Sequence, residues 1–131
     1  MTIFGALGTA GSGMTVMRTW LDAISDNVSN ANTVVATSEE AFRTRYIVAQ
    51  EKTGEDGVEV AGAHFGDAEG RLVHDPGHVL ADADGYVRHP DVDMTSQMTQ
   101  MIMAQRGYQA NAAVVSRATE SYQAALQIGR S

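Results

Sequence analysis

Apolar residues at both ends of the chain recur at alternating intervals of four and three, the heptad pattern of helices that pack along a narrow seam. Near the amino terminus the pattern runs unbroken through Ile3, Leu7, Ala10, Met14, Met17, Leu21, Ile24, Val28 and Ala31. Near the carboxyl terminus, with Gln105 and Thr119 as polar exceptions, it runs through Met94, Met98, Met101, Gln105, Tyr108, Ala112, Val115, Thr119, Tyr122 and Leu126. The pattern predicts two long terminal helices.

Residues that start and stop helices lie at the ends of both stripes. Asp93 can cap the second helix, and Gly129 can end it. The first helix runs into residues 27–33, which are rich in Asn, Ser and Thr and therefore favour a turn. At 1.5 Å per residue, the two helices would be about 43 and 50 Å long.

A period of 3.5 residues describes a seam between helices rather than the wider face of a helix on a globular core. Aromatic residues make up 6% of the chain, so little else is available for such helices to pack on. One interpretation is a self-contained helical hairpin; the one we favour adds contacts with other chains. The expected seam and assembly residues are Leu7, Met14, Met17, Leu21, Ile24, Val28, Met98, Met101, Tyr108, Val115, Tyr122 and Leu126.

The middle of the chain has the pattern of short strands. Residues 44–48 and 58–61 are strand-like, and the Gly-containing segment 53–57 between them predicts a hairpin turn. A second turn is expected at 82–85, followed by extended chain at 86–88. The predicted fold is therefore mainly α with a small β element. Two long terminal helices pair as an antiparallel coiled coil, and a β-hairpin module is inserted between them.

Charge divides the chain into the same three parts. The net charge is −7, and residues 34–93 hold 13 acidic and 5 basic residues. We expect 1–33 and 94–131 to form the amino- and carboxy-terminal helices of an inner core domain, and 34–93 to form a solvated β-hairpin and loop module. Without a basic face, the chain is unsuited to nucleic acid or to an anionic membrane surface.

Candidate chemistry is weak throughout. The chain has no cysteine, which excludes disulfides, thiolate nucleophiles and sulfur-based zinc sites. His74 and His78 have helical spacing for a metal, but Pro76 and Gly77 between them prevent a helix. We expect no catalytic residue, no cofactor and no metal, and therefore no enzyme.

The segment around Asp82, Asp84 and Gly85 resembles part of a calcium-binding loop. With Gly85 as the sixth residue of that loop, Leu80 would be the first and Asp91 the twelfth. A leading Leu supplies no ligand, and an Asp replaces the bidentate Glu. An Asp-Gly turn accounts for the same residues more simply.

Targeting signals are also missing from the sequence pattern. The first basic residue is Arg18, and four glycines interrupt the apolar run before it, so a cleaved secretory signal is not expected. No stretch approaches the roughly 20 apolar residues of a membrane-spanning helix, so direct membrane insertion is not expected either.

Two polar motifs within the heptad regions resemble those of the bacterial flagellar axial proteins. The segment Ile24-Ser25-Asp26-Asn27-Val28-Ser29-Asn30-Ala31-Asn32-Thr33 resembles their amino-terminal Asn-x-Ala-Asn-x-x-Thr region, and Arg106-Gly107-Tyr108-Gln109-Ala110-Asn111 resembles their carboxy-terminal Arg-x-Tyr-Gln-Ala-Asn signature. Residues 81–93 and the short chain are similar to family members of the proximal rod. The motif residues to which we assign a role are Asn27, Asn30, Asn32, Arg106, Tyr108, Gln109 and Asn111. Gln109 and Asn111 flank the stripe, where their amides are expected to fix register between subunits.

The resemblance implies a structural subunit of the proximal rod of the flagellar basal body, the drive shaft that transmits torque across the periplasm. It implies that the terminal helices form the inner core of a tube. It also implies export by the flagellar type III apparatus without a cleaved signal peptide. The implied partners are copies of the same chain, the rod proteins FlgB, FlgF and FlgG, and the basal adaptor FliE. The alternatives are another axial flagellar protein, a non-flagellar coiled-coil adaptor and a small metal-dependent enzyme.

Overall fold

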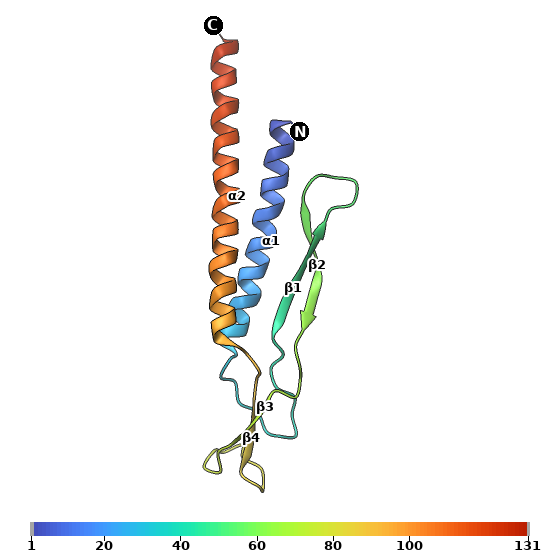
Figure 1. Ribbon diagram of the computed structural model, residues 1–131, viewed down its shortest axis with the longest axis vertical. Coiled ribbons are helices and arrows are strands. Elements are labelled where there is room, and N and C mark those ends of the chain that lie inside the picture. Colours follow the sequence, from blue (N-terminus) through green and yellow to red (C-terminus); the bar gives the residue numbers. More distant parts are fainter. Residues whose placement is uncertain (1, 131) are drawn as a thin grey trace.

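Two antiparallel helices run side by side along most of the molecule, as predicted (Figure 1). The computed structural model describes residues 2–130; Met1 and Ser131, the outer limits of the predicted end regions, lie outside the described residues. Helix α1 spans Ile3–Ser29 and α2 spans Met94–Gly129. Both chain termini therefore lie at one end of an elongated molecule.

The helix boundaries follow from capping residues. The Thr2 hydroxyl accepts a hydrogen bond from the Gly5 N–H at 3.0 Å and caps α1. The Asp93 carboxylate accepts from the Thr95 and Ser96 N–H groups at 3.0 and 3.3 Å, which confirms the predicted cap of α2. Helix α1 ends in the Asn-rich segment, as the sequence indicates, and Asn30 is its C-cap residue.

The predicted hairpin is present and lies beside α1 (Figure 1). Strand β1 spans Arg45–Glu51 and pairs antiparallel with β2, Val58–Phe65, so both strands are longer than predicted. The backbone N–H of Val58 donates to the Ser12 hydroxyl at 3.1 Å, and this bond ties the turn end of the hairpin to α1.

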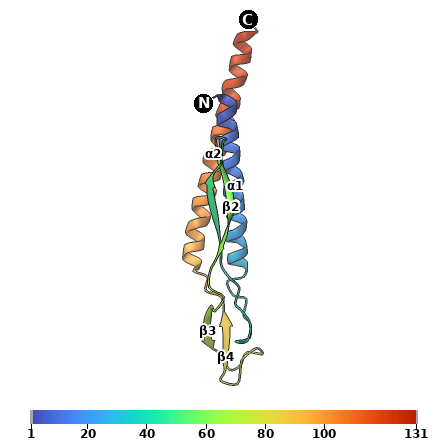
Figure 2. The ribbon, with the colours of Figure 1, turned by 90° about the vertical axis from the view of Figure 1, so that its right-hand side faces the viewer.

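A second hairpin lies beyond the other end of the helix pair (Figure 2). Strand β3 spans Arg71–His74 and pairs antiparallel with β4, Tyr86–His89. The prediction of a single hairpin with irregular flanks was therefore incomplete. Strand β3 has four residues, three of them exposed, so its sequence carries no alternation that marks a strand.

The hydrophobic core is a thin line rather than a layer. The buried apolar residues are mostly small: Ala10, Val16, Ala23, Ile24, Ala31, Ala41, Val87 and Ala104. Several large apolar side chains remain exposed on α2 and on the loop between β3 and β4. The fold of one chain therefore leaves much apolar surface in water.

Asp82 organises the turn that leads into β4. Its carboxylate accepts hydrogen bonds from the Tyr86 N–H at 2.9 Å, the Asp84 N–H at 3.0 Å and the Thr37 hydroxyl at 2.9 Å. The Tyr86 N–H first, and then the Thr37 hydroxyl, lower the pKa of Asp82 below its usual value of 3.8. The residues that resembled a calcium loop thus build a turn, as the simpler interpretation predicted.

The lowered pKa gives a testable pH dependence. Because the carboxylate form is favoured in the folded state, the stabilisation is fully present above the usual pKa and is lost as pH falls through the lowered one. An NMR titration of the Asp82 carboxyl carbon should show the lowered midpoint. Thr37→Val, which removes one donor, should move the midpoint back up. Identical midpoints in the two proteins would contradict this account of the turn.

Candidate assembly surfaces on the helix pair

Small residues set the register of α1 against α2. A Cβ on Gly13 would lie 2.9 Å from the Asn111 amide, and a Cβ on Gly107 would lie 2.8 Å from the Met17 sulfur. Nearer the other end of the pair, Trp20 Nε1 donates to Gln100 Oε1 at 3.3 Å. The two helices approach closely because glycine lies at the points of contact.

The line of closest contact is rotated by about one residue from the predicted stripe. On α2 the fully buried residues are Gln97 and Ala104, each one position before a predicted stripe residue, and on α1 Ala23 is buried beside Ile24. Heptad counting places the larger neighbouring residues in the seam between the helices. Close packing of the two backbones instead places the small residues there. The seam within one chain is therefore built mainly of small and amide side chains.

The predicted seam residues fall into three groups of exposure. Ile24 is buried. The half-buried group, along the edges of the contact, contains Leu7, Met14, Met17, Leu21, Val28, Met101, Tyr108 and Val115. The exposed group contains Met98, Tyr122 and Leu126. These last three contribute little to the seam within one chain, so their place in an assembly seam stays a prediction.

The Gly13 contact predicts a difference between two matched substitutions. Gly8 has open space around its Cα, so Gly8→Ala should stabilise α1 by up to about 1 kcal/mol through helix propensity. Gly13→Ala gains the same propensity but pushes on Asn111, which costs about 1–3 kcal/mol when packing is tight. Urea unfolding should therefore rank Gly8→Ala above Gly13→Ala. Equal stability of the two variants would contradict the close approach.

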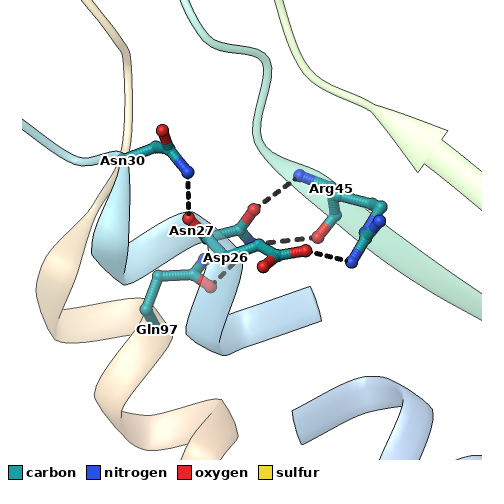
Figure 3. A network of polar contacts seen from close by, with 5 residues as sticks. All are labelled: Asp26, Asn27, Asn30, Arg45 and Gln97. Atoms are coloured by element: carbon teal, nitrogen blue, oxygen red, sulfur yellow. Dashed lines mark hydrogen bonds and ion pairs between the residues drawn. The ribbon is translucent and has the colours of Figure 1, made fainter. Parts of the chain in front are cut away.

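One buried amide joins α1, α2 and the first hairpin (Figure 3). Asn27 is 1% exposed, and its Nδ2 donates to Gln97 Oε1 and to the Arg45 carbonyl, both at 2.9 Å. Its Oδ1 accepts from the Arg45 N–H at 2.8 Å. The start of β1 is thus held to the helix pair through both backbone polar groups of one residue.

We call Asn27 with its partners Arg45 and Gln97 the Asn27 junction. Further polar contacts lie at the solvent-exposed edge of this junction. The Arg45 guanidinium pairs with Asp26 on α1, and Asn30 Nδ2 donates to the Asp26 carbonyl at 2.9 Å (Figure 3). Gln97 was not among the predicted site residues. A second line of spacing seven, through Gln97, Ala104 and Asn111, would have indicated it.

Helix α2 extends past the start of α1 at the end where the termini lie (Figure 1). It has 36 residues against 27 in α1. The Phe4 and Tyr122 rings meet edge to face with centroids 5.6 Å apart, and Leu126 lies one turn beyond Tyr122 on α2. We call Phe4, Tyr122 and Leu126 the end cluster; their exposed fractions are 66%, 41% and 51%.

A second apolar surface lies at the other end of α2. Met94, Met98 and Ile102, spaced one turn apart, are all exposed, and we call them the methionine patch. Single exposed apolar residues are ordinary, but contiguous rows are typical of surfaces that bind other proteins.

His74 and His78 both make contacts within the second hairpin and its loop. The His74 ring lies against the Tyr86 ring with centroids 5.0 Å apart, and His78 Nδ1 accepts from the Leu80 N–H at 3.1 Å. Within residues 2–130, no three histidine, cysteine or acidic side chains are grouped so as to hold a metal ion. Over the same residues, neither helix is long and apolar enough to cross a membrane.

Similarity to known proteins identifies the family to which this chain belongs. Residues 7–37 match the family described as flagella basal body rod protein, and residues 83–128 match the carboxy-terminal region of flagellar basal body rod FlgEFG proteins. The flagellar basal-body rod protein FlgC of Yersinia enterocolitica is 35% identical, with 99% of this chain and 100% of the relative covered. The chain belongs to the FlgC family of flagellar basal-body rod proteins.

Other relatives with the same printed name extend the similarity across bacteria. The FlgC protein of Salmonella typhimurium is 32% identical and that of Bacillus subtilis 29%, each over 99% of this chain and all of the relative. The protein is thus a structural component of the flagellar rod, and the two matched regions contain most of α1 and most of α2.

The residues of the two family motifs differ in burial and in the contacts that they make. Asn27 is buried in the junction, Asn30 caps α1, and Asn32 is exposed. Arg106 and Gln109 are exposed, and Tyr108 is half-buried. Asn111 packs against Gly13 and donates to the Gly107 carbonyl at 2.8 Å. The expectation that Asn111 flanks the seam was therefore wrong, because its amide lies in the contact between the two helices.

Proposed function

We propose that this chain is a subunit of the proximal rod that assembles through its terminal helices into the drive shaft that transmits torque. The observation that carries the proposal is the exposed apolar surface at the two ends of the helix pair. The end cluster, with Phe4 on α1 and Tyr122 and Leu126 on α2, and the methionine patch at the start of α2 both lie in water. Burial of apolar surface is worth about 25 cal/mol per Å², so neighbouring subunits that cover these surfaces would stabilise an assembly.

The construction of the molecule suits a load-bearing part. The helix pair is long. Asn27 fixes the first hairpin to it through two hydrogen bonds with Arg45, and a third hydrogen bond joins Asn27 to Gln97 of α2. A buried, fully paired amide favours one geometry over alternatives, so the hairpin and helices are expected to move as a unit under torque. The half-buried predicted seam residues, among them Met14, Leu21 and Val115, are proposed to complete their burial against neighbours.

The finer partners follow from the rod family. We expect contacts with copies of the chain, with FlgB, FlgF and FlgG, and with FliE at the base of the rod. We expect export by the flagellar type III apparatus with the amino terminus intact. A catalytic role is not part of the proposal.

The proposal is tested in a strain that lacks its own FlgC protein. Expression of this chain in that strain should restore swimming, and complete rods should be present in its purified basal bodies. The same result is expected when the gene is returned to its native locus in a deletion strain of its source bacterium. Normal rods in the deletion strain of the source bacterium would exclude the rod role and favour the non-flagellar adaptor. If the strain that expresses this chain forms rods that do not contain it, the rod role is likewise excluded and the non-flagellar adaptor is favoured.

A further inference from the structure

The chain contains two Asp-Gly steps, and each lies in the turn that leads into the second strand of a hairpin. Asp56 and Gly57 precede β2, and Asp84 and Gly85 precede β4. In such a step the side-chain carboxyl carbon of the aspartate is within reach of the next backbone nitrogen, and glycine has no Cβ to shield that nitrogen. Whether the two groups meet depends on how firmly the fold holds the peptide between them.

The Asp84-Gly85 peptide is held on both sides. The Asp84 N–H donates to the Asp82 carboxylate and the Gly85 N–H donates to the Asp82 carbonyl, both at 3.0 Å. The Gly85 carbonyl accepts from the Asp75 N–H at 2.9 Å. Gly85 is buried, and a Cβ placed on it would lie 3.0 Å from Pro76. The Gly85 nitrogen is therefore engaged, and it reaches the Asp84 side chain only when the turn opens.

The Asp56-Gly57 peptide is held on one side only. The Gly57 carbonyl accepts from the Lys52 N–H at 3.1 Å. Gly57 also faces α1, where an added Cβ would lie 2.6 Å from the Ser12 Oγ. Among residues 2–130, however, neither the Gly57 N–H nor the Asp56 carboxylate has a hydrogen-bond partner, and Asp56 is exposed. The backbone nitrogen and the side-chain carboxyl of this step are therefore free to approach each other.

We propose that Asp56 is a site of spontaneous isoaspartate formation and that the fold protects Asp84 from the same reaction. The Gly57 nitrogen attacks the Asp56 Cγ, and a C–N bond forms. One water leaves, made from the hydroxyl of the protonated carboxyl and the hydrogen of the Gly57 N–H. The product is a cyclic succinimide in the backbone of the turn.

Water then opens the ring at either of its carbonyl carbons. Attack at Cγ breaks the Cγ–N bond and restores aspartate. Attack at the former main-chain carbonyl breaks the other C–N bond, so the chain continues through Cβ and Cγ, and the old main-chain carboxyl becomes a free carboxylate. One water is lost and one is gained, so the reaction needs no oxidant, reductant or further reactant.

The extra methylene in the isoaspartate backbone lengthens the turn where it contacts α1. The bond that closes this turn, and the bond from the Val58 N–H to the Ser12 hydroxyl at 3.1 Å, both depend on the length of the chain through Gly57. Isoaspartate at position 56 therefore releases the turn end of the first hairpin from α1. The Asn27 junction at the other end of the hairpin stays intact.

Ageing of the purified wild-type chain tests the reaction. The folded protein is incubated at neutral pH and physiological temperature in water labelled with heavy oxygen and then digested. Chromatography with mass spectrometry separates the aspartate and isoaspartate forms of the Asp56 and Asp84 peptides. We expect at least about tenfold more isoaspartate at 56 than at 84, because reaction at 84 requires the turn to open first. In urea, where both turns are unfolded, the two sites should react at similar rates.

Asp56→Glu is the matched control. Glutamate keeps the charge at this exposed position, but its extra methylene requires a larger ring that closes far more slowly. Hydrogen exchange at the Val58 N–H should be several-fold faster in the isoaspartate form of the wild-type chain than in the fresh protein. Ageing should leave Val58 exchange unchanged in Asp56→Glu. Exchange at the Arg45 N–H, which Asn27 holds, should be unchanged in both proteins.

Three results would overturn the inference. Equal isoaspartate at 56 and 84 in the folded protein would show that the second turn gives no protection. No isoaspartate at 56 in the folded protein, whatever happens in urea, would show that the turn of the first hairpin is held as well. Unchanged Val58 exchange in the isoaspartate form would contradict the release from α1. None of these results depends on swimming, so the rod function is tested separately.

Discussion

Ile24→Asp is expected to unfold the helix pair and abolish swimming. Ile24 is 1% exposed on the face of α1 that meets α2, so its loss removes a large buried side chain and leaves a carboxylate without a partner. We expect a loss of more than about 4 kcal/mol, which is most of the stability of a small domain. Circular dichroism at 222 nm during urea unfolding measures the loss, and soft-agar spreading measures swimming.

The matched control for this charge change is Glu55→Lys in the turn of the first hairpin. Glu55 is exposed, and its carboxylate lies 3.9 Å from the Lys52 ammonium, a distance at which a surface ion pair contributes little. Unfolding should change by no more than about 0.5 kcal/mol, and swimming should be normal. A stable, motile Ile24→Asp strain would show that this face of α1 is not a seam.

The second large effect is expected for Asn27→Leu. The substitution keeps the approximate volume but leaves the Arg45 N–H, the Arg45 carbonyl and the Gln97 amide without their partner. Each unsatisfied buried group costs about 1–3 kcal/mol, and partial relaxation toward water gives an expected total of about 3 kcal/mol. Thermal unfolding should show this loss, and hydrogen exchange at Arg45 should accelerate.

Asn32→Leu is the control within the same motif, because Asn32 is exposed just beyond the end of α1. Its effect on unfolding should be within about 0.5 kcal/mol. If the two leucine variants unfold at the same temperature, Asn27 does not hold the hairpin to the helices, and the structural explanation of this motif position fails.

The helices could be predicted from the sequence because their signals are local. An unbroken run of three-and-four spacing, a capping Asp93 and the Asn-rich segment after Ser29 together define both elements. The exact line of contact could not be predicted in this way. Ala23, Ala104 and Gly107 count as weak hydrophobic positions, although their small size is what lets the backbones approach.

The junction and the second hairpin depend on contacts distant in sequence. The motif singled out Asn27, but its partners Arg45 and Gln97 lie 18 and 70 residues away, and no spacing rule connects them. Strand β3 is equally hidden, because its four residues become a strand through pairing with β4 rather than through their own pattern. Sequence therefore identified the important residue without the structure that makes it important.

The most direct test of the account is Leu126→Asp, studied both in solution and in the rod. Leu126 is 51% exposed beyond the start of α1, so the isolated variant should unfold within about 0.5 kcal/mol of the parent. In the rod, where we expect this side chain to be buried by a neighbour, the carboxylate should prevent assembly. Electron microscopy of basal bodies from a strain producing the variant should show few or no completed rods, whereas Glu55→Lys should show normal numbers. Completed rods at the parental frequency in the Leu126→Asp strain would contradict assembly through the terminal helices.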